Sequence, residues 1–323
     1  NKTSVFGYLD VVRITDVDLR YLDRVNGAVW HSPDSDIELL RGSDGLEAVF
    51  SMELDFGERS TKLTAHAVFL PERPVVDIGI AFDKLVPSDV TGRFAALQDF
   101  PKVNEPYSGQ LRILAQQSGV VNSVAFDLKG GGGTIAGNVI VDPAGDYDMT
   151  VNLSGVNSSA LVEFVPQITD AVLIDTLLDI RASGRIGPSG QIRRLKFDVN
   201  AEEGSITIYQ RFIKALEFES IEIAGEVRND FDAVSISVAK LYLGETELEA
   251  RIEASRIGEN LRTRLEAGLR KFKMSELSRY WPNDFGAPAR SWATTNLHSG
   301  YVERGDIALV IDLPLYALNE PKV

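Results

Sequence analysis

The sequence predicts a mainly β protein with antiparallel strands, and two features of the chain support this fold class. The first is a strict alternation of apolar and polar residues, clearest at 247–254, where apolar residues occupy the even positions and charged residues the odd ones. Such a run is typical of a half-buried strand with one apolar and one solvated face. The second is the shortness of the links between runs, because a parallel crossover needs about a dozen or more residues.

Further alternating runs flank this one on both sides. They span 195–199, 206–208, 234–238 and 307–311. The links between strands are rich in glycine, asparagine and acidic residues, at 184–190, 202–204, 228–230 and 244–245. These residue types favour tight turns. We therefore expect hairpins that follow one another along the chain.

Helical patterns are few and short. They occur at 87–97, with Ser88 as the expected N-cap, at 158–178, with a break near Pro166, and at 275–292, with a break at Pro282,. Each is followed by a turn and another alternating run. This recurrence predicts an internal repeat of roughly 70 to 110 residues, with repeat boundaries near the three helical segments.

Composition excludes several classes of function. The chain has 323 residues, 44% of them apolar and 25% charged, which is the balance of a folded protein,. The net charge of −14 argues against nucleic acid as a partner, since phosphate binding needs clustered Lys and Arg,. The absence of cysteine rules out disulfides, cysteine-ligated metals and thiol nucleophiles,.

No residue pattern predicts a catalytic, metal or cofactor site. The three histidines, His31, His66 and His298, are far apart in sequence and lack the spacing of paired ligands,. The glycine run at 130–133 lacks the GK[ST] sequence of a phosphate loop, so a hairpin turn is expected there,. Acidic clusters at 34–36 and 229–232 do not complete a calcium loop,. We therefore expect a protein that is not an enzyme.

One segment, 271–312, carries a specific pattern. Its Tyr280-Trp281-Pro282, Ala289-Arg290-Ser291-Trp292 and His298-Ser299-Gly300-Tyr301-Val302 stretches are followed by an alternating strand. This order resembles the helix-to-strand junction of AsmA-like envelope proteins of Gram-negative bacteria, in the YhdP-type branch. The resemblance implies a repeating, curled antiparallel sheet, a taco-like β-groove that conducts phospholipid between the inner and outer membranes. Residues 1–110 resemble the family only in texture.

The resemblance also implies a location and partners. It places the chain in the periplasm, anchored to the inner membrane by a segment upstream, with phospholipid acyl chains and envelope proteins as partners and without a cofactor. The chain starts at Asn1, and no run approaches the roughly 20 apolar residues of a membrane-spanning helix,. We therefore expect the whole chain, 1–323, to be a fragment of a longer groove.

On this interpretation, the apolar residues of the alternating runs line the groove. They are Leu195, Phe197, Val199, Ile206, Ile208, Ile221, Ile223, Val234, Ile236, Val238, Leu248, Ile252, Ile307, Leu309 and Ile311. Alternation alone favours a different fold, a closed β-sandwich, because most sheets with one apolar face are covered by a second layer. The corresponding function is that of a structural or protein-binding domain of the envelope.

The helical connection at 275–292 has two interpretations. In the first, Trp281 and Trp292 cover the apolar edge where the helix docks on the sheet, and Arg290 caps the helix or pairs with a carboxylate. In the second, this helix is a lid over the groove, or Arg290 and Arg279 contact lipid headgroups.

Overall fold

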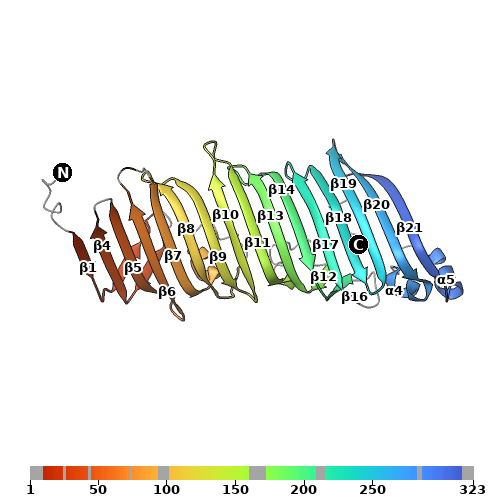
Figure 1. The fold of residues 1–323 in the computed structure, drawn as a ribbon, viewed down its shortest axis with the longest axis horizontal. Helices are drawn as coiled ribbons and strands as arrows, with labels where there is room; N and C mark the ends of the chain where they lie inside the picture. Colours follow the sequence, from red (N-terminus) through yellow and green to blue (C-terminus); the bar gives the residue numbers. More distant parts are fainter. Residues whose placement is uncertain are drawn as a thin grey trace. The chain divides into compact units, whose positions relative to one another are not determined.

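The computed structural model describes residues 10–24, 27–42, 45–70, 72, 75–93, 102–159, 172–208, 215–281 and 286–314. The chain divides into two compact units, residues 1–144 (unit 1) and 145–323 (unit 2). The predicted fold class is confirmed, since each unit is built mainly from antiparallel strands and contains only short helices (Figure 1). The division at 144/145 lies in the link between two strands and not in any of the predicted helical segments.

Unit 1 is a meander in which each strand from β4 to β10 pairs with its neighbours in sequence. Its strands are β1 (Val11–Ile14), β2 (Leu19–Leu22), β3 (Val29–Ser32), β4 (Ser35–Arg41), β5 (Leu46–Asp55), β6 (Ser60–Phe69), β7 (Val75–Leu85), β8 (Tyr107–Gln116), β9 (Val121–Gly130) and β10 (Gly133–Val141). A single short helix, α1 (Pro87–Thr91), lies between β7 and β8 in the described part of the unit.

The first hairpin of unit 1 is interrupted. β1 pairs with β4 and β2 pairs with β3, so each side of the hairpin consists of two short strands in line. The break on one side falls at Pro33, which has no N–H to donate to the ladder,. Ser32 and Ser35 flank it, both almost fully buried, and the Ser35 hydroxyl donates to Ser32 Oγ at 2.8 Å.

Unit 2 has a large sheet and a small one. The large sheet follows the order β11 (Tyr147–Asn157), β13 (Leu177–Ile186), β14 (Ile192–Ala201), β17 (Ser220–Arg228), β18 (Ala233–Leu243), β19 (Thr246–Ile257), β20 (Asn260–Lys273) and β21 (Tyr301–Pro314). The small sheet consists of β12 (Val172–Asp175), β15 (Gly204–Ile208) and β16 (Leu216–Phe218). Among the described strands, no pairing joins β11 to β21, so the large sheet is open.

The helical predictions are correct in part. The first segment forms α1, but the prediction of Ser88 as the N-cap is wrong, because Val86 is the N-cap and Pro87 begins the helix. Residues 94–97 of the predicted range lie outside the described residues. The third segment forms η3 (Met274–Glu276), α4 (Leu277–Tyr280) and α5 (Ala287–Asn296), with Pro282 outside the described residues. The second prediction is wrong at its end, because residues 172–175 and 177–178 belong to β12 and β13. Residues 160–171 lie outside the described part.

Tight turns join the long strands. The glycine run forms the predicted hairpin, since Gly130 pairs with Gly133 while Gly131 and Gly132 have φ values of 59° and 81°. Positive φ at both central residues is the requirement of a type I′ turn, which glycine meets without strain. In the turn between β17 and β18, three non-glycine residues, 229–231, also have positive φ values, between 50° and 68°.

Gly225 in β17 is a position where only glycine fits. A Cβ there would lie 2.6 Å from the Ser235 backbone oxygen and 2.7 Å from Cζ of Phe197. We expect Gly225→Ala to lower the free energy of unfolding by about 1–3 kcal/mol, because the backbone oxygen cannot move aside cheaply. Urea unfolding measures the change. Gly268→Ala is the matched control, since its nearest atom is the flexible Glu249 Cγ at 3.3 Å. Equal effects would contradict this explanation.

Candidate functional site

The strand register of unit 2 gathers apolar residues on one face of the large sheet. Residues paired across neighbouring strands point to the same face, so the pairs connect into four rows that cross the eight strands, named rows A to D from the end nearer α4. Row A contains Val156, Leu178, Ala201, Ile221, Leu241, Leu248, Leu269 and Gly305. Row B contains Leu153, Ile180, Val199, Ile223, Ala239, Ala250, Ala267 and Ile307.

The other two rows continue this face towards the opposite strand ends. Row C contains Val151, Ala182, Phe197, Gly225, Ile236, Ile252, Leu265 and Leu309. Row D contains Met149, Gly184, Leu195, Val227, Val234, Ala254, Thr263 and Ile311. Thr263 is the one polar side chain among these described positions, and none is charged. Unit 2 therefore carries an apolar face that spans its large sheet.

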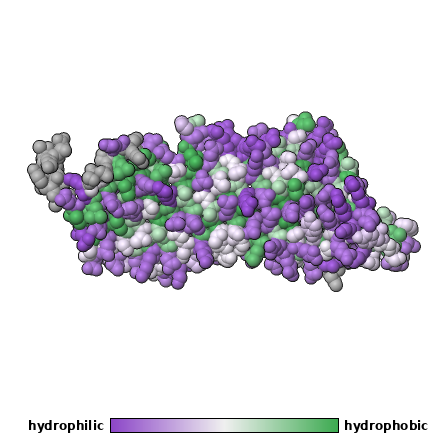
Figure 2. All heavy atoms as spheres, in the orientation of Figure 1, coloured by the Kyte–Doolittle hydropathy of each residue, from purple (hydrophilic) through white to green (hydrophobic). Residues whose placement is uncertain are grey.

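Most of this face is only half-buried. Phe197, Ile236 and Ile252 are of intermediate exposure, and Leu309 in the last strand is 40% exposed. In a closed sandwich, residues at such central positions are covered by the second layer. Figure 2 shows hydrophobic residues gathered over the strands of each unit, with hydrophilic residues along the strand ends.

Full burial occurs mainly along row A. Ala201, Ile221 and the neighbouring Leu243 form a cluster with Phe218 of β16, each of them at most 8% exposed. Ile206 of β15 and Tyr280 of α4 pack against this cluster. The small sheet and α4 therefore cover one end of the apolar face and leave rows C and D uncovered by this cluster.

Twelve of the residues predicted to line a groove lie in these rows. They are Leu195, Phe197, Val199, Ile221, Ile223, Val234, Ile236, Leu248, Ile252, Ile307, Leu309 and Ile311. The register shift in β18 separates Val238 from them. Ile236 pairs with Gly225 of row C, but Val238 pairs with Ala224 on the opposite face. The prediction that Val238 shares the apolar face is wrong, because a β-bulge breaks the period of two.

Ile206 and Ile208 also differ from the prediction. Both belong to β15, in the small sheet, and not to the large one. Ile206 packs onto the buried cluster from above and so covers the apolar face instead of forming part of it. The side chain of Ile208 lies outside the described residues.

Unit 1 has an apolar face of the same kind, which the sequence analysis did not identify. One row across it contains Ile14, Ile37, Phe50, Ala65, Ile80, Leu111, Phe126 and Gly137. The next row contains Val12, Leu39, Ala48, Ala67, Ile78, Ile113, Val124 and Val139. The sequence pattern that indicates this face is the alternation of the apolar Ile78 and Ile80 with Asp77 and Gly79.

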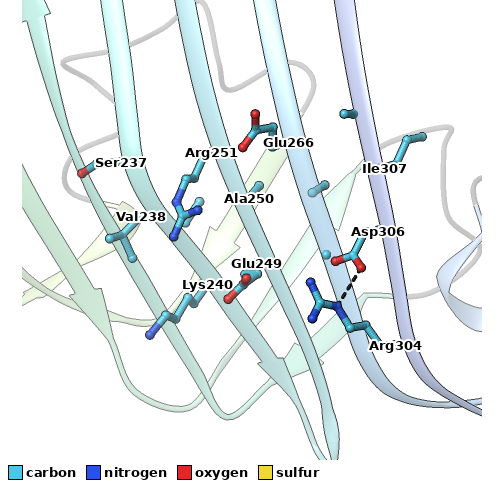
Figure 3. Close-up of a pocket in the computed structure, with 14 residues that line it drawn as sticks. Ser237, Val238, Lys240, Glu249, Ala250, Arg251, Glu266, Arg304, Asp306 and Ile307 are labelled. Atoms are coloured by element: carbon cyan, nitrogen blue, oxygen red, sulfur yellow. Dashed lines mark hydrogen bonds and ion pairs between the residues drawn. The ribbon is translucent and has the colours of Figure 1, made fainter.

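The opposite face of each sheet is polar and rich in ion pairs. In unit 1, Arg112 binds Asp77 through two hydrogen bonds of 3.0 and 2.7 Å. In unit 2, Arg262 binds Asp312 in the same manner, at 2.8 and 3.1 Å. Figure 3 shows charged side chains of β18 to β21 close together on this face, including the pair between Arg304 and Asp306, with Val238 beside Lys240. This face suits contact with water.

Asp146, immediately before β11, is a buried carboxylate that pairs with two arginines. Its side chain is 8% exposed and accepts hydrogen bonds from Arg185 Nε at 2.9 Å and Arg193 Nη2 at 3.0 Å. The bond from Arg185, followed by that from Arg193, lowers the pKa of the Asp146 carboxyl. A carboxyl whose pKa is lower in the folded state contributes stability at pH values above its unfolded pKa, about 3.9.

We therefore expect stability to fall as the pH drops from about 4 through the folded pKa of Asp146. Asp146→Asn should be less stable than the unchanged chain at neutral pH, and the difference should shrink in acid. Urea midpoints measured across this pH range test the expectation. A difference that does not depend on pH would show that the carboxylate charge is not the cause.

Arg290 caps the end of α4. Its Nε donates to the Trp281 backbone oxygen at 3.1 Å and its Nη2 to the Ser278 oxygen at 3.4 Å. Trp281 lies in an apolar depression with Leu248, Leu269 and Phe272, as the packing interpretation expects. Trp292 does not fit that interpretation, because it is 62% exposed.

We expect Arg290→Ala to lower the local stability of α4 by about 1–2 kcal/mol, because two backbone carbonyls at the helix end lose their hydrogen bonds from a charged donor. Hydrogen exchange at residues 277–280 measures this local change. Arg304→Ala, which breaks only an exposed pair with Asp306, should leave exchange there unaltered,. Unchanged exchange in Arg290→Ala would contradict the capping role and favour a role in contacting a ligand.

The histidines do not form a site. His31 lies between Asp18 and Asp55, His66 contacts Glu47, and His298 is exposed. Among the described residues, no group of His, Asp and Glu is arranged to hold a metal ion. Within the same residues, no helix has the length and hydropathy to cross a membrane. Comparisons with protein-family models, curated proteins and solved structures found no match to this chain.

Proposed function

We propose that this chain is a lipid-transfer segment of a bacterial envelope protein, which carries phospholipid acyl chains along the apolar face of its sheets. The observation that supports this most strongly is the uncharged, half-exposed face formed by rows A to D. With strands about 4.8 Å apart and about 3.4 Å per residue, rows B to D, which lie beyond the buried cluster, cover about 460 Å² of sheet. The largest apolar patch on a soluble monomer is about 300–600 Å² and is often functional.

The shape of the face suits a chain-like ligand. The depression beside Leu248, Leu269 and Trp281 is lined mainly by apolar side chains, whereas a small polar substrate requires several converging polar groups. Removing acyl methylenes from water contributes about 0.8 kcal/mol for each CH₂. Because neighbouring rows offer equivalent apolar contacts, a bound chain can slide without crossing a large barrier. The function needs neither a cofactor nor covalent chemistry.

The cellular setting of the proposal comes from the resemblance of 271–312 to AsmA-like proteins. It places the transfer path in the periplasm, between the inner and outer membranes, with an inner-membrane anchor elsewhere in the protein. The apolar sheet faces support the lipid-binding part of the proposal.

Mass spectrometry of lipid extracted from the purified protein tests the proposal. We expect phospholipid in amounts comparable to the protein after extensive washing in detergent-free buffer. A protein that is free of lipid and that does not take up phospholipid from vesicles would overturn the proposal. It would favour the alternative, a structural or protein-binding domain.

A further inference from the structure

A short hairpin arm at one end of unit 1 is attached to the rest of the sheet by few contacts. The arm consists of β2 and β3, which pair with each other. Among the described residues, one backbone pair, between His31 and Asp55, joins β3 to β5. At the base of the arm, the Glu53 N–H donates to Ser32 Oγ at 3.2 Å. Side-chain contacts therefore contribute a large share of what holds the arm in place.

His31 lies between two carboxylates. Its Nδ1 is 3.2 Å from Oδ2 of Asp55 in β5, and its Nε2 is 3.2 Å from Oδ1 of Asp18, which immediately precedes β2. A neutral imidazole has one N–H, so it can donate to one of these carboxylates and turns a lone pair towards the other. The protonated ring donates to both. The geometry of these contacts therefore matches the charged form of His31.

Charged groups from three elements surround this imidazole. Asp18 and Asp55 contact it directly. Arg20 of β2 lies beside it, with Nε 3.6 Å from Oδ1 of Asp18. The hydrogen bond from the Gly57 N–H, at 2.7 Å, followed by that from the imidazole, lowers the pKa of the Asp55 carboxyl, and the charge of Arg93 lowers it further. Asp55 therefore stays ionised over the pH range in which histidine side chains change charge.

Arg93, after α1, holds the arm through contacts that do not titrate, because an arginine stays charged. Its guanidinium lies 5.2 Å from the centre of the Trp30 ring and 5.0 Å from that of Phe56. Its Nη1 also donates to the Val29 backbone oxygen. Trp30 and Phe56 contact each other edge to face, with ring centroids 6.3 Å apart. Release of the arm would therefore separate Trp30 from Phe56 and expose the indole ring.

We propose that His31 is a pH-sensitive clasp, which attaches the arm to β5 when the ring is protonated and releases the arm when the ring is neutral. This role does not depend on lipid binding. The charged ring makes two hydrogen bonds in the attached arm and the neutral ring one, so attachment is favoured at low pH and weakens as the pH rises. Histidine side chains change charge between about pH 5 and 8. Since protonation of the two carboxylates below about pH 4 would remove the acceptors, attachment should be strongest at about pH 5.

Quenching of Trp30 fluorescence by acrylamide tests the clasp in the full chain. The chain has three tryptophans, so a parent protein with Trp281→Phe and Trp292→Phe retains Trp30 as its single reporter. We expect quenching to increase by about twofold or more between about pH 5 and pH 8, because local opening exposes the indole. The increase should follow the titration of the His31 ring signals, measured by NMR.

Asp18→Asn separates the clasp from a purely structural contact. The Asp18 side chain is 58% exposed, so this change leaves the fold intact. An asparagine amide can donate to a neutral imidazole while the other ring nitrogen donates to Asp55, so the arm should stay attached even at about pH 8. His66→Gln is the matched control, since His66 also contacts a carboxylate, that of Glu47 at 2.6 Å. It should respond to pH as the parent does. Quenching that does not depend on pH in the parent, or an equal increase in Asp18→Asn, would overturn the proposal.

Discussion

Ile252→Asp is expected to abolish the retention of phospholipid while the protein stays folded. Ile252 lies in row C next to Ile236, at the centre of the apolar face, and is only half-buried. A carboxylate there would have to lose its water when an acyl chain covers it, at a cost of several kcal/mol. Since each 1.4 kcal/mol is a tenfold change, affinity should fall by a factor of at least about 100. Ile236→Asp should behave in the same way.

Stability separates an open face from a closed core in this experiment. In the unliganded protein, the carboxylate introduced by Ile252→Asp would keep contact with water, so the free energy of unfolding should fall by less than about 2 kcal/mol. Val310→Asp is the control, because Val310 is 66% exposed on the opposite face, paired with Arg264. It should retain lipid. Ile252→Asp protein that is unfolded, or that retains lipid as the control does, would contradict the open apolar face.

Phe218→Ala is expected to cause the largest loss of stability in unit 2. Phe218 is 3% exposed and packs in the cluster with Ala201, Ile221 and Leu243. Truncating a buried phenylalanine typically costs about 3–5 kcal/mol, a large share of the roughly 5–15 kcal/mol that holds a domain folded. Without Phe218, the small sheet would also lose its main contact with row A.

Urea unfolding followed by circular dichroism measures this loss. Phe231→Ala is the matched control, since Phe231 is the same residue type in the same unit but is 60% exposed. It should change the free energy of unfolding by no more than about 0.5 kcal/mol. Similar effects of the two substitutions would show that the small sheet does not anchor the covered end of the apolar face.

The sequence was sufficient to predict the fold class and twelve positions of the apolar face in unit 2, because alternation at positions such as 247–254 determines both. It was not sufficient at Val238, where a bulge changed the face of the side chain without a local signal. The run at 206–208 is too short to indicate its sheet, and the structure places it in the small one. Apolar spacing at 172–178 was compatible with a helix, but cross-strand pairing made it extended.

Whether the apolar face is open or closed could not be predicted from alternation. A sandwich and an open sheet require the same period of two in each strand, and they differ only in what lies above the face. The contacts of Phe218 and Tyr280 show that row A is covered, because Phe218 belongs to the small sheet and Tyr280 to α4. For Arg290 the sequence left capping, pairing with a carboxylate and contact with headgroups open, and its acceptors, the backbone oxygens of Ser278 and Trp281 at the end of α4, became evident only in three dimensions.

The most direct test of the open apolar face is the reactivity of a single cysteine at position 252 towards a membrane-impermeant maleimide in lipid-free protein. The neighbouring Glu253→Cys, on the polar face, sets the rate of an exposed thiol, and Phe218→Cys sets that of a buried one. We predict that Ile252→Cys reacts at a rate close to that of Glu253→Cys and becomes protected when phosphatidylcholine is added. A rate as slow as that of Phe218→Cys in the lipid-free protein would contradict the open face.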